Sequence, residues 1–418
     1  MLVVIMDLGY GKHYAVRTEQ QVRKLLPEAG VVTVSEEIGQ TMNELVQKSD
    51  TDYLLTLFAG DQLSPELCIQ LPEKLQLLDA DCGVLLKGRE QEEEPVRPII
   101  WRIKALRDGA KGFADRKALP FERYVLIERL LHLNKTWSCQ QLKLSDIKGV
   151  RYPKLRWQHL DEEWALVAPL LPPSPIYMKR NQPVISIVMC VYEDTSYLPW
   201  AIRSVMNQTI SDWELIIVND GGFVEELQQV LLPYQGDDRI TVIHHERNLG
   251  KAASLNTALE AVTTDWFLEL DADDWLVNNC LEIFVKWSSE ADEQDALLCA
   301  CHHVWLELPS QARIVYQQRS TKIAFDERDI LAAPEPLAPR CYRTAAVRDM
   351  GGWWTSDVYS GRLYEDIQML VRMNRLGRLK GSELPLYHRR LRHNSITKRN
   401  QDKYEIWRMW LEHLLEDS

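Results

Sequence analysis

The amino-acid sequence predicts an α/β protein with two domains, each built around a mostly parallel sheet with flanking helices. The chain has 418 residues, which is enough for two hydrophobic cores. Short apolar runs alternate with helical stretches over residues 1–150, and the alternation restarts at Val184. Strands that alternate with helices are typical of βαβ units, whose strands lie parallel in one sheet.

Residues 1–150 contain apolar runs of strand length, separated by segments in which apolar residues recur with helical spacing. From this pattern we predict strands at Met1–Met6, Val31–Val34 and Tyr53–Phe58, and helices at Val16–Leu26 and Met42–Lys48.

Residues 151–182 are predicted to form a linker with one short helix. Four prolines lie between Pro169 and Pro175, and proline interrupts helices because it lacks an N–H donor and fixes φ. We expect the second domain over residues 183–418. Its predicted strands are Val184–Met189, Glu214–Val218, Ile240–Ile243 and residues 266–270, and its predicted helices include Tyr197–Asn207 and Lys251–Val262.

The composition excludes several classes of protein. The net charge of −12 argues against a general nucleic-acid-binding protein and against a polybasic membrane anchor. No apolar run approaches the roughly 20 residues that cross a bilayer, and the first strand lacks the basic leader of a signal peptide. The eight cysteines are scattered, as is typical of reduced thiols. We therefore expect a cytoplasmic protein.

An acidic strand end carries the first indication of chemistry. Residues 266–270 are mostly bulky and apolar, and Asp271, Asp273 and Asp274 follow directly. Carboxylates this close repel one another unless a cation compensates their charge. A divalent cation that also binds phosphate is one solution, because Mg²⁺ takes one or two carboxylates plus substrate oxygens. The alternative is an acidic turn that caps the next helix.

Residues 43–63 repeat residues 256–276 without gaps, with eight identical positions. Phe58 and Gly60 stand where the second copy has Asp271 and Asp273. Further along, the segment from Pro120 to Tyr124 resembles the segment from Leu363 to Ile367, with Arg123 in the place of Asp366. These differences predict that residues 1–150 are a degenerate copy without metal or base carboxylates. Chance similarity between two βαβ domains is the alternative.

The second half resembles a family 2 glycosyltransferase with the GT-A fold. The resemblance covers residues 183–400 and implies two tandem GT-A-like domains, the first degenerate. Six short motifs occur in the order found in that family, and they are Ile185–Tyr192 with Gln208 and Thr209, Leu215–Gly221, Arg247–Gly250, Asp271–Asp274, Gly351–Trp353, and Glu365 with Asp366.

The resemblance implies a metal and a catalytic base. Asp273 would bind Mn²⁺ or Mg²⁺, and Asp271 would contact the donor ribose or the metal. For Asp274 we expect a helix cap, and indirect support of the metal site is the alternative. Asp366 would take the proton from the acceptor hydroxyl, with Glu365 in support. Acidic residues that complement a helix dipole are the alternative for this last pair.

The resemblance also implies contacts to the donor and the acceptor. Asp220 would contact the nucleotide base, Tyr192 and the backbone at Cys190 would pack on it, and Arg247 or Lys251 would reach a phosphate. A core tyrosine and solvated charges are the alternatives. Trp353 and Trp354 would stack on the acceptor sugar or be buried. Within the closing segment, one of His388, Arg392 and His393 would contact the diphosphate or the metal.

The family transfers a sugar from a nucleotide donor to a hydroxyl, so we expect a metal-dependent, inverting hexosyltransferase that uses a UDP-sugar in polysaccharide synthesis. Glu193, Asn219 and Gly222 depart from the family pattern and leave the donor open. The acceptor would be a glycan, a lipid-linked precursor or a protein. Peripheral contact with a membrane and a homodimer stay open, as do two other functions: a nucleotidyltransferase and a non-catalytic protein that binds sugar or nucleotide.

Overall fold

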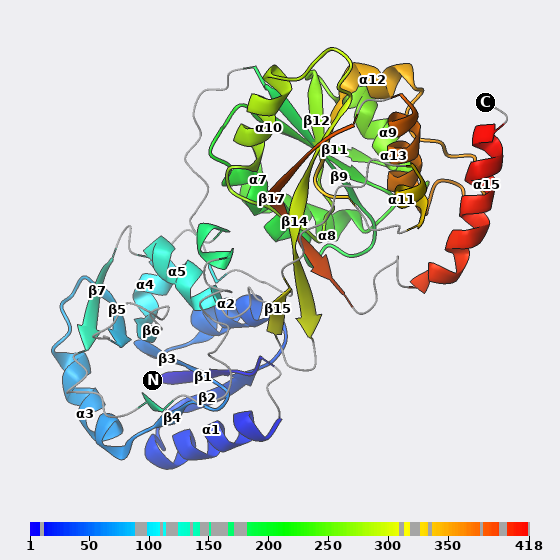
Figure 1. The fold of residues 1–418 in the computed structure, drawn as a ribbon. Coiled ribbons are helices and arrows are strands. Elements are labelled where there is room, and N and C mark those ends of the chain that lie inside the picture. The colour runs from blue at the N-terminus through cyan, green and yellow to red at the C-terminus, as the bar shows by residue number, and fades with distance from the viewer. Residues whose placement is uncertain are drawn as a thin grey trace. The chain divides into compact units, whose positions relative to one another are not determined.

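The computed structural model describes residues 1–8, 12–87, 98–108, 112–113, 124–133, 137–142, 150–151, 166–170, 182–308, 313–317, 327–332, 337–376, 379–392 and 399–416. The chain divides into two compact units (Figure 1). Unit 1 comprises Met1–Pro173 and Glu307–Val315, and unit 2 comprises Ser174–Leu306 and Tyr316–Ser418. The division after Pro173 falls inside the predicted linker, whereas the segment Glu307–Val315 was expected in the second domain.

Unit 1 contains a mixed six-stranded sheet in the order β2-β1-β3-β6-β5-β7. Neighbouring strands run parallel from β2 to β3 and again between β5 and β7, and β6 is antiparallel to both of its neighbours. The strands are β1 (Leu2–Met6), β2 (Gly30–Val34), β3 (Tyr53–Phe58), β5 (Cys82–Lys87), β6 (Pro98–Arg102) and β7 (Ser138–Leu142); β4 (Gln62–Leu63) pairs with β8 (Val150–Arg151). The helices are α1 (Lys12–Leu25), α2 (Ile38–Lys48), α3 (Pro65–Gln76), α4 (Ile103–Asp108) and α5 (Val125–Leu133).

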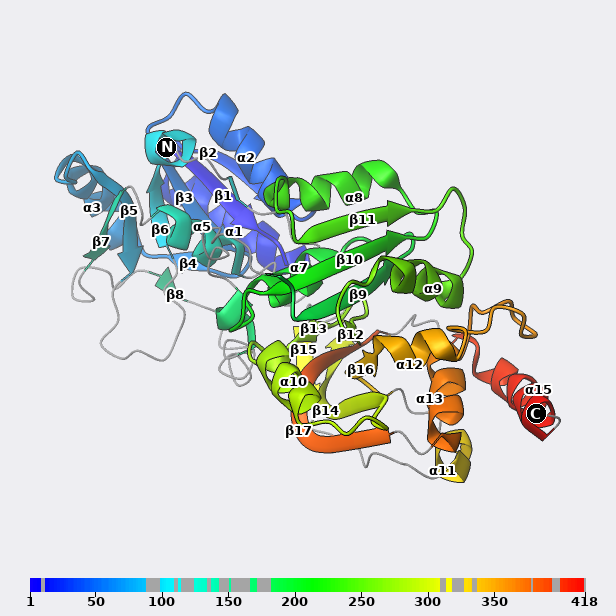
Figure 2. The same cartoon turned by 90° about the horizontal axis from the view of Figure 1, so that it is seen from above.

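Unit 2 contains a larger mixed sheet in the order β11-β10-β9-β12-β16-β14-β17-β13, and β15 pairs with β14. Figure 2 shows β11, β10 and β9 side by side. The strands of this sheet are β9 (Ile185–Val191), β10 (Trp213–Asn219), β11 (Ile240–His244), β12 (Trp266–Glu269), β13 (Trp275–Leu276), β14 (Leu297–Leu308), β15 (Arg313–Gln317), β16 (Arg340–Arg343) and β17 (Leu379–Leu391). The end of β14 and the first three residues of β15 lie in the segment Glu307–Val315, which belongs to unit 1. The helices are α7 (Leu198–Met206), α8 (Val224–Leu231), α9 (Lys251–Ala261), α10 (Cys280–Ser289), α11 (Glu327–Ala332), α12 (Thr344–Asp349), α13 (Glu365–Arg375) and α15 (Tyr404–Glu416).

Two hydrophobic cores cover the two faces of the sheet in unit 2. Along β9, Val188 packs into one core, while Ile187 and Met189 pack into the other, because successive side chains of a strand point to opposite faces. Helices α9, α11, α13 and α15 lie on the first side and α7 and α10 on the second (Figure 1). Burial on both faces explains why these strands read as continuous apolar runs.

The two units share one connectivity. In chain order, β1, β2, β3, β5, β6 and β7 of unit 1 take the same neighbours and directions as β9, β10, β12, β14, β16 and β17 of unit 2. In the gapless sequence alignment, α2 falls on α9 and β4 falls on β13, residue for residue.

A polar clamp recurs at matched positions of the two units. In unit 1 the Asn43 amide donates to the Phe113 carbonyl oxygen (2.9 Å) and accepts from the Phe113 N–H (2.7 Å). In unit 2 Asn256 makes the same two bonds to Trp353, both at 2.8 Å. The repeat aligns Asn43 with Asn256, so both copies tie the middle of a helix, α2 or α9, to the backbone of an aromatic residue in the same way.

A cation–π contact recurs between antiparallel strands. Arg102 lies opposite Tyr53 with its guanidinium 5.5 Å from the ring centre, and Arg343 lies opposite Trp266 at 4.5 Å. The repeat aligns Tyr53 with Trp266, so unit 1 keeps the packing of unit 2 at this edge as well. Among the described residues, no helix is both long and apolar enough to cross a membrane.

Candidate active site

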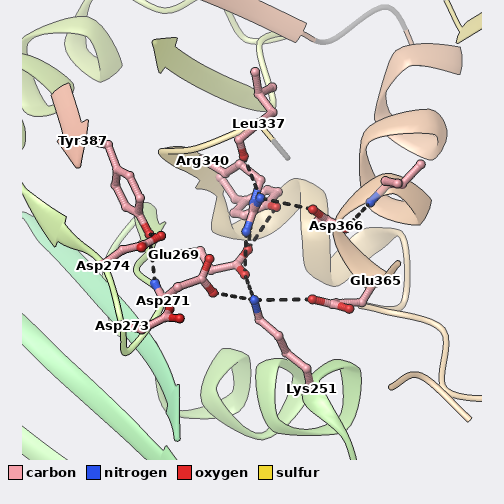
Figure 3. A network of polar contacts seen from close by, with 12 residues as sticks. Lys251, Glu269, Asp271, Asp273, Asp274, Leu337, Arg340, Glu365, Asp366 and Tyr387 are labelled. Carbon is pink, nitrogen blue, oxygen red and sulfur yellow. Dashed lines mark hydrogen bonds and ion pairs between the residues drawn. The ribbon is translucent and has the colours of Figure 1, made fainter. Parts of the chain in front are cut away.

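Five of the predicted site residues lie close together near the carboxyl ends of the parallel strands of unit 2 (Figure 3), and they are Lys251, Asp271, Asp273, Glu365 and Asp366. Lys251 begins α9, Glu269 ends β12, and Asp271 follows it. Glu365 and Asp366 form the first turn of α13. Ligands bind at this edge of open α/β sheets because the loops that follow the strands meet there.

Lys251 lies at the centre of a cage of carboxylates. Its Nζ lies 2.5 Å from Asp271 Oδ1, 3.1 Å from Glu269 Oε1 and 3.3 Å from Glu365 Oε1. The expectation that Lys251 reaches a phosphate stays a prediction, and in this structure its charge is shared among three acids.

A buried ion pair lies behind this cage. Glu269 and Arg340 are directly opposite each other on β12 and β16, and the guanidinium approaches the carboxylate to 2.7 and 3.0 Å. Arg340 also donates to the Leu337 carbonyl oxygen (2.6 Å) and lies 3.6 Å from Asp366 Oδ2. The Tyr342 hydroxyl donates to Glu269 at 3.3 Å.

The cations and the burial separate the proton affinities of these acids. Burial by itself would raise the pKa of Asp271, but Lys251 and Arg340 outweigh it and lower that pKa to about 2. For Glu365, burial wins over the attraction of Lys251, and Asp366 and Glu269 add to it, so its pKa rises to about 7. A carboxyl group with a raised pKa suits proton transfer near neutral pH.

Asp274 corrects one expectation, because it does not cap a helix. The next helix, α10, begins at Cys280 with Asn279 before it. Asp274 is buried and accepts from the Tyr387 hydroxyl (2.9 Å) and the Arg390 N–H (2.7 Å). Burial, followed by Asp273 and Asp271, raises the pKa of Asp274 well above its usual range. It thus fixes β17 against the acidic turn.

Asp273 faces a cation from the end of β17. Its Oδ2 lies 2.5 Å from Arg392 Nη2, and Arg392 Nη1 lies 2.9 Å from Asp194 Oδ2. Of the three closing-segment candidates, Arg392 therefore contacts a predicted metal ligand directly. His393 lies outside the described residues.

His388 is half-buried against aromatic rings. It stacks on Trp275 and on His303, and its Nδ1 accepts from Trp305 Nε1 at 3.1 Å. Burial, with His303 adding to it, lowers the pKa of His388 well below its usual range. The ring is therefore neutral, with its proton on Nε2, and as a neutral ring it brings no positive charge to a phosphate.

Asp220 holds the loop that precedes α9. Its carboxylate accepts from the Leu249 N–H (2.8 Å) and the Gly250 N–H (2.9 Å), and it lies 2.8 Å from His245 Nδ1. The loop contains Arg247, which is exposed. Contact between Asp220 and a nucleotide base stays a prediction. In this structure Asp220 holds the backbone of the loop.

The other donor candidates lie near the end of β9. Tyr192 is exposed just past the strand, where a ring could lie on a base. Cys190 is partly buried; burial, with Glu269 and Asp271 adding to it, raises the pKa of its thiol well above the usual range. Cys190 therefore borders the acidic cage. The seven cysteines whose side chains the structure describes are all free thiols.

Trp353 is a core residue, as in the second of the two alternatives predicted for it, stacking on a sugar or burial. It is 2% exposed and packs against Phe267 and Tyr342. It cannot stack on an acceptor sugar without unfolding the core. Trp354 is partly exposed beneath the guanidinium of Arg372, which lies 4.3 Å from its ring centre. Stacking of Trp354 on an acceptor stays a prediction.

Three site residues were missed in the sequence: Glu269, Arg340 and Tyr387. Glu269 carried a signal, because a lone charge inside a buried apolar strand requires a partner. Arg340 begins a short strand of buried residues and carried the same signal. Nothing local in the sequence distinguishes Tyr387, whose hydroxyl receives the Asp271 N–H at 3.2 Å and donates to Asp274.

The residues present fit a divalent cation bound with substrate. Among the described residues, no group of three or more His, Cys, Asp or Glu side chains is arranged to hold a metal. Asp271 and Asp273 supply two carboxylates, and Mg²⁺ is commonly bound by one or two carboxylates together with phosphate oxygens. Their side chains are 32% and 28% exposed, so both are accessible. Asp271 forms an ion pair with Lys251, and Asp273 forms one with Arg392.

Part of this chain is similar to known proteins. Haemophilus influenzae has an "Uncharacterized glycosyltransferase" that is 32% identical over 118 residues, 28% of this chain and 36% of that protein. Escherichia coli has a "Putative colanic acid biosynthesis glycosyl transferase WcaA" that is 35% identical over 106 residues, 25% of this chain and 38% of that protein. The chain thus matches less than two fifths of either relative.

Among solved structures, S. aureus TarS 1-349 in complex with UDP is similar to this chain with a TM-score of 0.42 and 18% identity, over 53% of this chain and 63% of that chain. The family model described as "Glycosyl transferase family 2" matches residues 186–328, which include the acidic turn but end before Glu365 and Asp366. Residues 186–328 of this chain are therefore similar to glycosyl transferase family 2.

Proposed function

We propose that the protein is a metal-dependent, inverting glycosyltransferase that moves a sugar from a nucleotide donor to an acceptor hydroxyl. One observation carries the proposal: in a chain with a segment similar to glycosyl transferase family 2, the acidic turn after β12 faces a second acidic pair at the start of α13, and Lys251 contacts both. Transfer needs one set of acids at the diphosphate and another at the acceptor hydroxyl.

In this proposal Asp271 and Asp273 hold Mn²⁺ or Mg²⁺ together with the donor. When bound, such a cation neutralises the charge that develops on the diphosphate leaving group. Lys251 and Arg392, which lie against these two carboxylates, add positive charge on the same side. Asp220 keeps the loop before α9 in place, so that Tyr192 and the loop border the base of the nucleotide.

The acceptor side of the site is formed by the first turn of α13. Asp366 or Glu365 removes the proton as the hydroxyl attacks the anomeric carbon from the face opposite the leaving group, which inverts the configuration. We propose Asp366 as the base because it is the more accessible of the two; its side chain is 18% exposed against 10% for Glu365. Glu365 shares Lys251 with Asp271 and supports the arrangement.

The colanic acid name of one relative supports a place in the synthesis of a cell-surface polysaccharide. We propose a glycan or lipid-linked precursor as the acceptor and a UDP-sugar as the donor. An acidic group such as Asp220 can accept from the N–H of uracil.

A donor screen tests the proposal. Purified protein is incubated with Mn²⁺ and a panel of UDP-, GDP- and TDP-sugars, and released nucleoside diphosphate is measured. We expect release from one donor, abolished by EDTA and by Asp273→Ala. A matched control, Asp212→Ala, removes an exposed acid outside the site and should leave release unchanged. Release that survives both EDTA and Asp273→Ala would contradict metal-dependent transfer, and no release from any donor would overturn the proposal.

A further inference from the structure

Glu269 is a buried carboxylate on which two cations converge. It is 3% exposed, and its oxygens contact Lys251 Nζ (3.1 Å), Arg340 (2.7 and 3.0 Å) and the Tyr342 hydroxyl (3.3 Å). Burial of a carboxylate is costly unless it is paired in this way. Burial would raise its pKa, but Arg340 and Lys251 outweigh burial, so the pKa of Glu269 is lowered and the group is charged.

Both cations also contact other acids of the site (Figure 3). Lys251 continues to Asp271 at 2.5 Å and to Glu365 at 3.3 Å, and Arg340 continues to Asp366 at 3.6 Å. Glu269 thus joins the acid that we assign to the donor side with the two acids that we assign to the acceptor side. It does so from beneath, without itself facing the solvent.

Unit 1 shows what the same fold does without this network. In the repeat, Thr56 stands in the place of Glu269 and Phe58 in the place of Asp271, and the same alignment, extended to the starts of α2 and α9, puts Ile38 in the place of Lys251. The cation and both carboxylates are thus replaced together by uncharged residues.

One cross-strand contact nevertheless remains in unit 1. Trp101 Nε1 donates to Thr56 Oγ1 at 3.1 Å, where unit 2 has the bond from the Tyr342 hydroxyl to Glu269. The strand register of unit 1 pairs Leu55 with Ile100, which puts Ile99 in the place of Arg340. The connectivity therefore forms without the charges.

We propose that Glu269 is a positioning residue for sugar transfer: through Arg340 and Lys251 it fixes Asp366 and Glu365 relative to Asp271. This inference rests on the function proposed above for the same site. Because the fold forms in unit 1 without such a network, folding alone does not account for the buried charges of unit 2. Transfer does account for them, since a displacement of about 1 Å between reacting groups lowers the rate about 100-fold.

The paired variant E269T/R340I tests the inference, because it copies the combination found in unit 1. Removal of one partner of a buried ion pair leaves the other charge uncompensated, whereas removal of both does not. We therefore expect the paired variant to unfold at a higher temperature than R340I alone. For the donor found in the screen, we expect kcat to fall about 100-fold while the donor KM changes by less than about threefold.

The E269Q variant provides a second measurement that does not depend on how well the pair repacks. It keeps the size and shape of the side chain, removes the charge that holds the two cations, and replaces one of the two acceptor oxygens with an NH2 group. We expect the same split between kcat and KM.

The matched control removes another ion pair of unit 2, far from the cage along the strand direction. Asp237 and Arg239 (2.7 Å) precede β11, at the end of the sheet opposite to the site. We expect D237N/R239M to keep the wild-type kcat, whatever its unfolding temperature.

The outcomes separate this inference from the proposed function. A folded E269T/R340I or E269Q variant with wild-type kcat overturns the positioning role and leaves the proposed function intact. An equal loss of kcat in D237N/R239M also overturns it, because the loss would then follow from stability alone. If the wild-type protein releases no nucleoside diphosphate from any donor, the proposed function fails, and the positioning role fails with it.

Discussion

Asp271 and Glu365 contact the same ammonium group, yet their pKa values move in opposite directions. Lys251 lies 2.5 Å from Asp271 and 3.3 Å from Glu365, and Arg340 also acts on Asp271. The closer cation overcomes burial at Asp271, where the pKa falls to about 2, but not at Glu365, where it rises to about 7. The same lysine thus keeps Asp271 ionised while the pKa of Glu365 stays near 7.

The raised pKa of Glu365 predicts a pH dependence of stability. The folded protein holds this proton more tightly than the unfolded chain, so the contribution of Glu365 to stability is full below about pH 4.5 and is lost as the pH rises to about 7. Glu365→Gln removes that loss. We expect the free energy of unfolding of the variant, relative to wild type, to increase by about 2–3 kcal/mol between pH 5 and pH 8.

Urea unfolding followed by circular dichroism at the two pH values measures this difference. Glu260→Gln, which changes an exposed acid on α9, is the control. Identical pH dependence in wild type and Glu365→Gln would show that burial does not raise this pKa.

At the residue scale, sequence alone identified the acids of the site but not what holds them. Asp271, Asp273 and Asp366 belong to motifs of short span, so a local pattern contains them. Glu269 and Arg340 are 71 positions apart, and their contact depends on the register of two antiparallel strands. The burial of Trp353 likewise depends on residues that only the folded sheet brings together.

The segment before α13 turns at two adjacent glycines, Gly351 and Gly352. Both have positive φ, 75° and 71°, which side chains rarely adopt. A Cβ at Gly351 would meet open space, whereas a Cβ at Gly352 would meet the Asn256 amide that clamps Trp353. Both positions therefore require a positive φ, and only a side chain at Gly352 would also displace the Asn256 amide.

This difference predicts unequal effects of alanine at the two positions. We expect Gly351→Ala to cost about 1 kcal/mol through backbone strain, and Gly352→Ala to cost at least about 2 kcal/mol more because the clamp must open. Chemical denaturation of the two variants measures both values. Equal costs would mean that the Asn256 clamp adds nothing to stability.

At the scale of elements, strands were easier to predict than the starts of helices. The strands at Met1–Met6 and Tyr53–Phe58 were predicted almost to the residue, because buried strands are continuous apolar runs. Helix α2 begins at Ile38, four residues before the predicted start, and follows Glu37 in a left-handed conformation without a capping side chain. A start without a cap leaves little signal in the sequence.

At the scale of the whole molecule, two copies of one connectivity carry different numbers of charged groups at the same strand ends. Ile38, Thr56, Phe58 and Gly60 of unit 1 correspond to Lys251, Glu269, Asp271 and Asp273 of unit 2. A nucleotide diphosphate with its cation requires carboxylates that unit 1 lacks at these positions.

We therefore expect the full chain to bind one nucleotide, not two. Calorimetric titration with UDP in the presence of Mn²⁺ should give a stoichiometry of one per chain. Asp273→Ala should abolish the binding completely, because no second site takes over. A stoichiometry of two, or one site that persists in Asp273→Ala, would contradict the assignment.

The alternation of strands and helices predicted two α/β units but not the mixed character of their sheets. Strands β6 and β16 are short and are inserted antiparallel among parallel neighbours, and their pairing is set by long-range register. A single periodicity cannot distinguish a strand that continues a parallel sheet from one that reverses it.

Asp61, in unit 1, is the counterpart of Asp274 in the gapless alignment. Both residues close a tight turn by donating their N–H to a carbonyl oxygen three residues earlier, that of Phe58 in one copy and Asp271 in the other. The last acid of the Asp-x-Asp-Asp pattern thus belongs to the turn itself, whereas the first two are the acids that we propose bind the cation. A copy that keeps the last acid without the first two therefore keeps the turn without the two carboxylates that we propose hold a cation.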